Sequence, residues 1–567
     1  LFSNGLSLNT GTGLISGTIN HSWLNRAYDR TGSVTIRVTD DAAFPASDDV
    51  TFNIKGRTTW RYRTVINRGY MAGGYRSSVP WSNVNRTSHS NDTSNNFQAF
   101  DLRGFNFNKN KTLGPEGLIS KRSKEKSIQI LPILNLGIGN ETFASGAGAA
   151  VAFISKKFNG FIAPSIGVEK LSYLDLKSTL ETHNIRGKGY AERLNGPTFL
   201  NAEIPFSLAY NPSKFFTLMI GNGRHHIGAG SSSVILSDYS RNHPYAAIQT
   251  KVWKLRYTNL FSGYYQENNT TQLFYNPNKF STTHYLEIIA SKKFTLGLFE
   301  TVIFKSKDTL VTRSFDINYL NPIIFYRPVE YSTGSSDNVL MALNMTYNPF
   351  EKFQIFGQFL IDEFLFAYLR ADIQHFIKPS KPTADPWGWW ANKHAGLLGF
   401  KWKEPFSIPG VLLHTEVSYA RPYIFTHLNS KENYGNNNLP LSHHLGANFD
   451  QWLTYLTYAK NNLMVELSYR YWQQGLDEFS NQNWGSNINL SYNTRQSEFG
   501  NYLLQGYLST YQKISFSANY LVIPQVNMSV FLNASYIQQN LPNNFTYREP
   551  LLNFGIKTNL FNNYTEI

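Results

Sequence analysis

The chain has 567 residues, no cysteine, a formal net charge of +14 and an aromatic content of 15%. The absence of cysteine excludes a disulfide framework, reactive-thiol chemistry and cysteine-ligated zinc. No run of 18 or more apolar residues is present, which excludes helical membrane spans. The basic charge points to an anionic partner, but no RRM, KH or zinc-finger pattern indicates nucleic acid. Because the chain starts at Leu1 without a signal sequence, we expect a mature or fragmentary product.

Residues 1–56 carry short runs that predict a small separate β module. Gly5–Asn9 and Thr12–Thr18 indicate two strands joined by a glycine-bearing turn. Val34–Val38 and Val50–Ile54 alternate apolar with polar residues. These phrases resemble the Ig-like, cadherin-like repeats of bacterial surface proteins, which implies an Ig-like β-sandwich. The aspartates of this module could bind calcium as in cadherins; they are Asp29, Asp40, Asp41, Asp48 and Asp49. Aspartate in turns is ordinary turn chemistry, which is the interpretation we favour, so we predict no metal site.

Residues 57–126 are predicted to form an aromatic and basic connector and loop. Trp60–Arg63 alternates aromatic with basic residues, and Tyr70–Arg76 combines two tyrosines and two glycines with a basic residue. Such interleaving can stack single-stranded nucleic acid or sugars, although a glycine-rich loop is the interpretation we favour. The composition changes abruptly near Phe97, which leaves open whether residues 1–97 belong to the same natural protein.

The clearest strands are at the end of the chain. Ile514–Val522, Val526–Tyr536 and Leu552–Phe561 alternate apolar or aromatic residues with small, polar or charged ones, and in Val526–Tyr536 Phe531 is the one apolar residue on the polar side. A period of two places these sets on opposite faces of a strand. The runs are about 10–12 residues long, whereas soluble strands average roughly 5–6. A tilted strand needs about 9–11 residues to cross a bilayer, so we predict membrane-spanning strands.

Similar runs continue through the preceding part of the chain. In chain order they are Ile128–Leu136, Ala149–Ile154, Phe158–Val168, Phe206–Tyr210, Phe215–Ile220, Ile248–Phe261, Tyr285–Ala290, Leu296–Phe304, Leu340–Tyr347, Phe353–Ile361, Leu397–Trp402, Leu412–Tyr423, Trp452–Tyr458, Leu463–Trp472, Ile488–Tyr492 and Leu503–Tyr511. With the three closing strands the runs number nineteen. Since bacterial barrels take even numbers and neighbouring runs can merge or split, we expect roughly 18 strands. The sequence therefore predicts an all-β fold, in which residues 127–567 form a transmembrane antiparallel β-barrel in the outer membrane of a Gram-negative bacterium.

Several ordered blocks between about residues 125 and 567 carry a family resemblance. They are Met219–Gly230, Val252–Leu260, Phe315–Pro322, Phe325–Glu330, Gln358–Phe364, Gly388–Lys393, Tyr419–Tyr423 and Asn433–Asn448. Together they resemble the Wzi-type capsule-assembly outer-membrane barrels and their gliding-motility relatives in Bacteroidota. The resemblance implies an 18-stranded barrel that binds surface polysaccharide as a lectin and does not catalyse. Gly228–Ser231 departs from the family, whose members often carry an acidic residue and an aromatic residue there.

A sugar site needs flat apolar faces beside forked hydrogen-bonding groups. Trp387, Trp389 and Trp390 supply three indoles next to Asn392 and Lys393. This group is a candidate polysaccharide site, and an interfacial aromatic belt is the equally weighted alternative.

Three arginines beside glycine or proline turns are further candidates for binding acidic sugars. Arg224, Arg327 and Arg421 carry planar guanidinium groups that suit carboxylates. The alternative, which we favour, is a set of lumenal salt bridges. Their expected acidic partners are Glu330, Asp362, Glu363 and Glu416.

Catalysis is the least supported function. Ser231–Ser233, His225, His226 and Asp238 offer triad residue types, and His443 with His444 forms another pair, but no G-x-S-x-G or H-E-x-x-H spacing is present. We predict a non-catalytic barrel without cofactor whose partners are an acidic surface polysaccharide, outer-membrane lipid and other surface-assembly proteins. The alternatives are a diffusion channel for anionic solutes and, less favoured, an outer-membrane hydrolase.

Overall fold

The computed structural model describes residues 126–558, except for 156, 186, 266–276, 306–316, 321–336, 364, 380–384, 461, 524–525 and 543–544. Before residue 126 it describes only the backbone of six strands. Two hairpins in this part, β1 (Leu6–Asn9) with β2 (Leu14–Gly17) and β3 (Thr31–Thr39) with β4 (Ser47–Lys55), match the predicted runs. The Ig-like assignment and the boundaries at residues 56 and 126 stay predictions.

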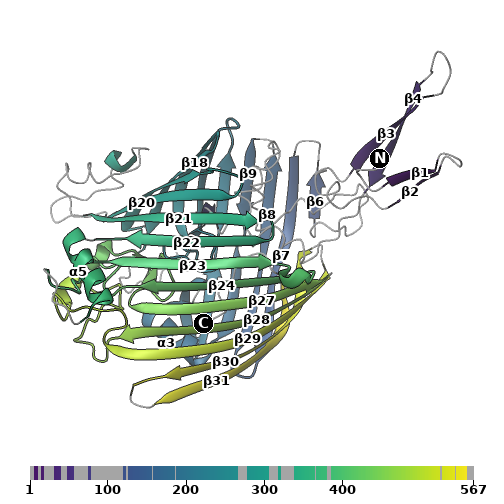
Figure 1. Cartoon of the computed structure of the whole chain (residues 1–567). Helices are drawn as coiled ribbons and strands as arrows, with labels where there is room; N and C mark the ends of the chain where they lie inside the picture. Colours follow the sequence, from purple (N-terminus) through teal and green to yellow (C-terminus); the bar gives the residue numbers. More distant parts are fainter. Residues whose placement is uncertain are drawn as a thin grey trace. The chain divides into compact units, whose positions relative to one another are not determined.

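A large antiparallel sheet closes into a ring, and within the described residues this ring has eighteen strands (Figure 1). Around the ring they are β7 (Lys126–Gly139), β8 (Phe143–Ser155), β9 with β10 (Phe158–Ile162, Ser165–Lys170), β13 with β14 (Thr198–Glu203, Phe206–Tyr210), β15 (Phe216–Gly223), β17 (His243–Val252), β18 (Leu255–Tyr264), β19 (Lys279–Ile288), β20 (Phe294–Lys305), β21 (Asn338–Phe350), β22 (Phe353–Ile361), β23 (His394–Lys403), β24 (Val411–Ala420), β27 (Phe449–Lys460), β28 (Leu463–Leu476), β29 (Tyr507–Ile523), β30 (Met528–Asn540) and β31 (Thr546–Thr558). The predicted all-β barrel is therefore confirmed.

Shorter elements extend or fill the ring. They are β6 (Ile119–Arg122), which pairs with β7; β11 (Asn184–Ile185) and β12 (Gly189–Asn195), which pair with each other; β16 (His225–Ile227), which pairs with β5 (Tyr75–Ser77); β25 (Gly435–Asn436), which pairs with β26 (Leu439–Pro440); the helices α3 (Tyr173–Thr182) and α5 (Phe366–Ile377); and the 3-10 turns η4 (Ile317–Leu320), η5 (Pro405–Ser407), η6 (Ser430–Glu432) and η7 (Tyr492–Thr494). Among the described residues, no helix combines the length and apolarity needed to cross a membrane.

Two adjacent wall strands are each interrupted by a proline. Pro164 separates β9 from β10, and Pro205 separates β13 from β14. Proline has no backbone N–H to donate to the ladder. The carbonyl groups still accept, because Ala163 N donates to Pro205 O at 2.9 Å and Ala149 N donates to Pro164 O at 3.2 Å. The wall therefore stays continuous across both breaks.

Pairing of β31 with β7 closes the ring. Gly555 lies opposite Gly137 at this seam, and a Cβ atom at Gly555 would lie 1.9 Å from Leu136 O. The Phe531 ring covers the inner side of Gly137, and the Lys557 ammonium lies 4.8 Å from the centre of that ring. This explains why Phe531 breaks the alternation: an aromatic ring shields glycine where the strands approach most closely.

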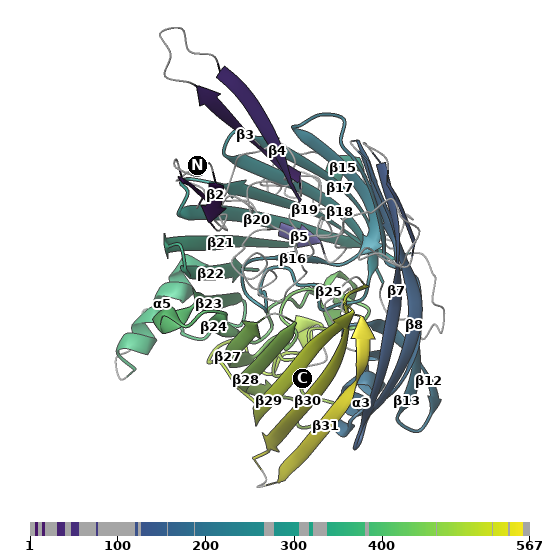
Figure 2. The ribbon, with the colours of Figure 1, turned by 90° about the vertical axis from the view of Figure 1, so that its right-hand side faces the viewer.

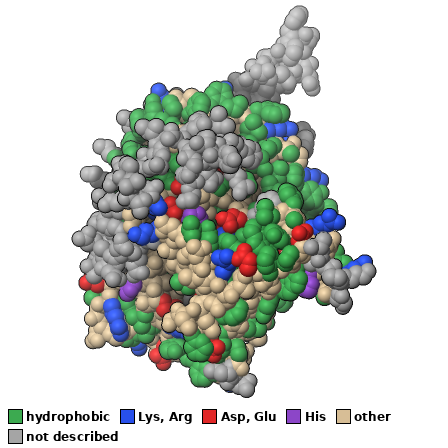
Figure 3. Space-filling view, turned by 90° about the vertical axis from the view of Figure 1, so that its left-hand side faces the viewer, with side chains coloured by type: hydrophobic (Ala, Val, Ile, Leu, Met, Phe, Trp, Pro, Cys, Tyr) green, Lys and Arg blue, Asp and Glu red, His purple; other side chains and the backbone are tan. Residues whose placement is uncertain are grey.

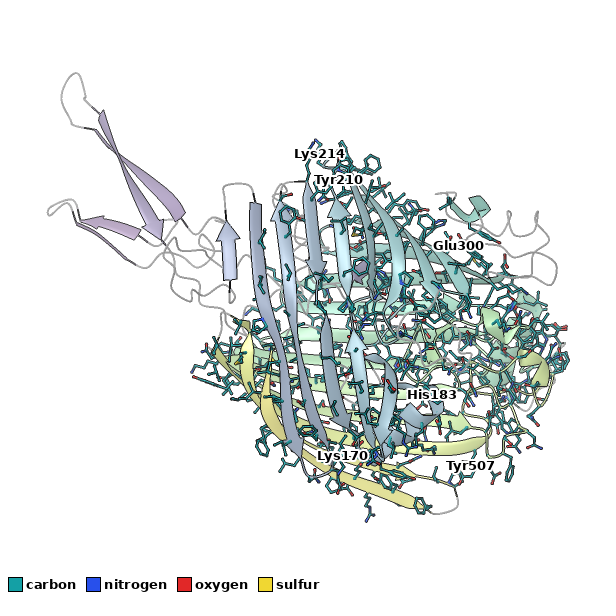
Figure 4. All side chains as sticks on the ribbon, turned by 180° about the vertical axis from the view of Figure 1, so that it is seen from behind. Lys170, His183, Tyr210, Lys214, Glu300 and Tyr507 are labelled. Carbon is teal, nitrogen blue, oxygen red and sulfur yellow. The ribbon has the colours of Figure 1, made fainter. Side chains whose placement is uncertain are left out.

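The wall is apolar outside, and on β29–β31 its inner face is mostly polar. On β29–β31 the outward side chains include Ile514, Phe516, Leu532 and Phe554, whereas Ser515 and its inward neighbours are polar. Connections at one end are short, such as residues 253–254 and 351–352, and those at the other end are mostly long, such as 224–242, 362–393, 421–448 and 477–506. Tyr210 and Lys214 mark the short-turn end, and Lys170 and His183 mark the long-loop end (Figure 4). Short periplasmic turns and long outer loops are typical of bacterial barrels.

Four predicted runs need correction. Ile248–Phe261 is wrong as one strand, because Trp253 (φ 52°) and Lys254 form a two-residue turn between β17 and β18. Ile488–Tyr492 is not a strand; Ile488 is buried in the interior core. Tyr507–Tyr511 and Ile514–Val522 belong to one 17-residue strand, β29, and residues 503–506 of the run Leu503–Tyr511 precede it.

Two long connections fold into the barrel instead of away from it. Residues 224–242 and 421–448 are mostly buried, and β16 and β25 lie inside the ring (Figure 2). Ile227, Val234, Ile424 and Phe425 pack against inward side chains of the wall in one hydrophobic core; the wall residues of this core include Leu260, Tyr285, Phe299, Leu340, Phe356, Leu360 and Leu397. Beside strands β17–β24, the interior is therefore filled by protein.

Candidate functional site

Buried wall residues hold residues 224–242 in place. The Gln358 side chain donates to Ile227 O at 2.7 Å and accepts from Val234 N at 2.9 Å. Gly228 (φ 118°) lies against this amide, since a Cβ atom there would be 2.1 Å from Gln358 Nε2. The Glu416 carboxylate accepts from Ser231 N at 3.0 Å, Ser231 Oγ at 2.9 Å and Ser232 N at 3.0 Å. Glu416 is thus a lumenal acidic group, and it anchors an inward loop.

Five aromatic side chains gather at the long-loop end; we name them the aromatic cluster (Tyr368, Trp389, Trp390, Tyr492 and Phe499). The Tyr368 ring lies 4.8 Å from Trp389 and 5.6 Å from Phe499. Trp390 lies 4.6 Å from Tyr492 and 6.2 Å from Trp389. Trp390 is buried, whereas Trp389 is only half-buried and Phe499 is exposed. The cluster therefore presents a partly open aromatic surface.

Arg495 and Glu498 complete this surface with a forked cation and a carboxylate. The Glu498 carboxylate accepts from Trp389 Nε1 at 3.2 Å, Trp390 Nε1 at 2.9 Å and Arg495 Nε at 3.0 Å. The Arg495 guanidinium lies 4.5 Å from the centre of the Trp390 ring. Burial alone would raise the pKa of Glu498, but the hydrogen bonds from Arg495 and the two indoles outweigh it and lower that pKa. The carboxylate is therefore held charged.

Lys393 lies beneath the cluster. Its ammonium is 3.2 Å from Glu363 and 3.8 Å from Asp362, and it lies over the rings of Trp390 and Tyr492 at 5.1 and 4.6 Å. Burial raises the pKa of Asp362 to about 6, and the charge of Lys393 opposes that shift. Lys393 is fully buried, so its charge neutralises the carboxylates of Asp362 and Glu363 inside the protein and does not face solvent.

Asn392, Arg421 and Trp387 all connect to α5. The Asp372 carboxylate accepts from Asn392 Nδ2 at 2.9 Å and from Arg421 Nη1 at 2.9 Å. Trp387 stacks on His375 at 4.0 Å with a 2° angle between the rings. The structure therefore brings the three tryptophans, Asn392, Lys393 and Arg421 together. The side chains of Trp387, Asn392, Lys393 and Arg421 contact other protein groups there.

The remaining predicted site residues lie elsewhere. Arg224 is buried and donates to Gly187 O. Arg327 and Glu330 lie outside the described residues. The predicted acidic partners were incomplete, because Arg421 pairs with Asp372 on α5.

The residue types of a catalytic triad have other contacts. Ser231 donates to Glu416, and Ser233 donates to Ile227 O at 2.7 Å. His226 Nδ1 lies 3.5 Å from Asp238. His443 Nε2 lies 3.1 Å from Gln451, and burial lowers the pKa of His443 to about 3. Among the described residues, no group of three or more His, Asp or Glu could hold a metal ion.

Sequence reasoning did not single out Tyr492, Arg495, Glu498 or Asp372. The available signal was the spacing Tyr492-x-x-Arg495-x-x-Glu498, which places an aromatic, a cation and a carboxylate within seven residues.

Lys and Arg side chains lie near Asp and Glu side chains over the long-loop end of the barrel (Figure 3).

No protein-family model and no curated protein matches the chain. Among solved structures it is similar to Wzi of Escherichia coli, an outer-membrane protein involved in group 1 capsule assembly and a carbohydrate-binding β-barrel, with 13% identity, a TM-score of 0.44, and 76% of this chain and 83% of that chain covered. It is also similar to Pseudomonas aeruginosa OprD, with 9% identity, a TM-score of 0.39, and coverage of 76% and 93%. It is similar as well to Acinetobacter baumannii OccAB2, with 8% identity, a TM-score of 0.40, and 76% of this chain and 97% of that chain covered.

At these identities and TM-scores, the likenesses do not decide function. The closed ring of eighteen strands, the apolar outward face and the short and long connections make the chain an outer-membrane β-barrel protein.

Proposed function

We propose that this barrel binds or anchors an acidic surface polysaccharide at its long-loop end, without catalysis. The observation that supports this most is the aromatic cluster with Arg495 and Glu498. Trp389 offers a partly open ring face, and the adjacent guanidinium and carboxylate supply forked donors and acceptors. A sugar ring stacks on such a face while its hydroxyl and carboxylate groups bond to the fork.

Within this proposal the predicted residues take two roles. Trp389 contacts the glycan, and Arg495 replaces Lys393 as the cation that meets sugar carboxylates. Trp387, Asn392 and Arg421 position the surface through α5. Involvement in gliding motility is the variant that the family resemblance alone implies.

The filled interior beside β17–β24 supports binding over passage of solutes, since residues 224–242 and 421–448 occupy space that a channel needs. One observation favours a diffusion channel as second candidate. The inner face of β29–β31 is lined by small polar residues of intermediate exposure, including Ser515, Ser517, Asn533 and Ser535.

Calorimetric titration of the full chain in detergent tests the proposal, using one acidic and one neutral capsular polysaccharide at low and high salt. We expect the acidic polymer to bind and salt to weaken it. Trp389→Ala removes one aromatic face, about 0.5–1.5 kcal/mol, and therefore raises Kd roughly two- to twelvefold. The matched control is Trp253→Ala, because Trp253 is 80% exposed at the short-turn end.

Two outcomes contradict the proposal. Equal loss of binding in Trp253→Ala would show that the long-loop surface is not the site. Absence of heat with either polymer, together with ion-selective conductance in planar bilayers, would establish the channel instead.

A further inference from the structure

The burial of α5 (Phe366–Ile377) is inverted relative to a helix that packs on a soluble protein. An α-helix turns about 100° per residue, so residues three or four apart share a face. Phe366, Leu369, Ile373, Phe376 and Ile377 fall on one such face, which we name the apolar arc. Phe366, Phe376 and Ile377 are 77%, 86% and 65% exposed, respectively.

The opposite face of α5 holds the helix on the barrel. Ala371 is buried, and Tyr368 lies against Trp389 at 4.8 Å. His375 stacks on Trp387, and Asp372 pairs with Arg421 at 2.9 Å. Since this face carries the polar and aromatic anchors, rotation of the helix to bury the apolar arc would break all of these contacts. The exposure of the arc is therefore built into the docking of the helix.

The position of α5 shows what surrounds the apolar arc. The helix begins five residues after β22 ends at Ile361, and it projects outward from the ring of strands beside β22–β24 (Figures 1 and 2). A helix that leaves the rim of a membrane barrel sideways enters the interfacial region of the outer leaflet. There an apolar face is buried in lipid and a polar face is not.

The outer wall next to α5 continues the same apolar surface. Phe359 on β22, Leu398 on β23, Val417 on β24 and Trp452 on β27 line a groove of about 580 Å³. Three of these side chains are about half exposed on the lipid-facing wall, and Phe359 is 41% exposed. The apolar arc and the groove therefore border one stretch of bilayer. Arg370 is exposed and lies about 20° around the helix from Ile377, at the edge of the arc, where a cation reaches the headgroup level.

We propose that α5 is an interfacial membrane helix whose apolar arc lies among the acyl chains of outer-leaflet lipid beside β22–β24. This function is separate from glycan binding. It also fixes the height of the aromatic cluster, because Tyr368 of the cluster belongs to this helix and lies against Trp389. A surface ligand would then be held directly above the lipid headgroups.

The absence of cysteine from the chain allows single-site labelling. An environment-sensitive fluorophore is attached to Phe376→Cys, Ile373→Cys or Gln374→Cys in the full chain, reconstituted in phosphatidylcholine vesicles containing a lipid with a nitroxide near the headgroup end of its acyl chain. Gln374 is the matched control, since it is exposed and lies about 160° around the helix from Phe376. Leu398→Cys on the wall gives the value for full lipid contact.

We expect quenching at positions 376 and 373 to approach that at 398 and to exceed that at 374 by about twofold or more. Substitution of the exposed Phe376 leaves the core intact. Ile373, a second position on the arc, shows whether the result at Phe376 reflects only a local distortion at that residue. Quenching at 376 and 373 as weak as at 374 would overturn the inference, because the arc would then face water or another protein.

Discussion

The substitution Glu416→Gln tests how much one buried carboxylate of the wall contributes to holding the inward loop, residues 224–242. Ser231 N donates to Glu416 Oε2, whereas Ser232 N and Ser231 Oγ donate to Oε1. A glutamine has one acceptor oxygen in place of two. Whichever way its amide is turned, one backbone N–H then faces an NH₂ group. The change keeps the size of the side chain and removes its charge and one acceptor; it also alters the contact of Oε2 with His414 Nε2 at 3.1 Å.

The magnitude follows from these contacts. A hydrogen bond to a charged group contributes about 1.5–3 kcal/mol, and a buried donor without an acceptor costs about 1–3 kcal/mol. We expect the free energy of local opening of residues 227–236 to fall by about 2–4 kcal/mol. Since each 1.4 kcal/mol is tenfold, amide exchange in this segment accelerates roughly 30- to 700-fold.

Hydrogen exchange read by mass spectrometry measures this change in detergent micelles. Glu466→Gln is the matched control, because Glu466 is also an inward wall carboxylate and accepts from Thr457 at 2.8 Å, away from the loop. Unchanged exchange of residues 227–236 in Glu416→Gln would refute the reasoning. Equal acceleration in both variants would refute it as well, because the effect would then be a general loosening of the barrel.

Two further predictions concern the buried charges at the long-loop end. Lys393→Met leaves Asp362 without its cation and is expected to lower the free energy of unfolding by about 3–5 kcal/mol, measured by denaturant titration; Lys352→Met breaks an exposed pair with Glu404 at 2.7 Å and should change it by under about 1 kcal/mol. Because the pKa of Asp362 is raised to about 6 in the folded chain, the folded state binds more protons than the unfolded state between about pH 4 and 6. The stability of the wild type should therefore fall relative to Asp362→Asn as pH rises through this window, and a constant difference between the two would contradict the raised pKa.

The alternation of side chains predicted the barrel wall because lipid and lumen impose it on every strand. The prediction of strands failed where something other than contact with lipid or lumen set the residue type: a hairpin turn, an exposed polar residue, or packing in the barrel interior. The turn at Trp253 and Lys254 has no glycine or asparagine, the usual residues of two-residue hairpins, so two strands read as one. Polar Gln512 is exposed on the outward side of β29, which made one long strand look like two. Ile488 is apolar because it fills the interior.

The sequence predicted some of the residues that gather at the candidate site, but not what each of them contacts. Three tryptophans close to Asn392 and Lys393 indicated a cluster, and the structure assembles one. Sequence alone cannot tell that Lys393 is buried, because that depends on Glu363 and on Tyr492, which lies 99 residues further along the chain. The carboxylates expected as partners of the arginines did not include Asp372, with which Arg421 pairs. Its partner Asp372 belongs to a helix that was not predicted at all.

The same chain segments build the aromatic cluster and fill the barrel. Trp390 lies edge-on to Tyr423 at 6.5 Å, and the Asp362 carboxylate accepts from Phe425 N at 3.0 Å. Phe425 and its neighbour Ile424 belong to the interior core. Trp390 therefore rests on the segment that occupies the interior, and both are fixed by one set of buried contacts. Under the proposed function, a surface held this way binds with little ordering of side chains, so filling the interior beside β17–β24 and ordering the outer surface are two results of the same packing.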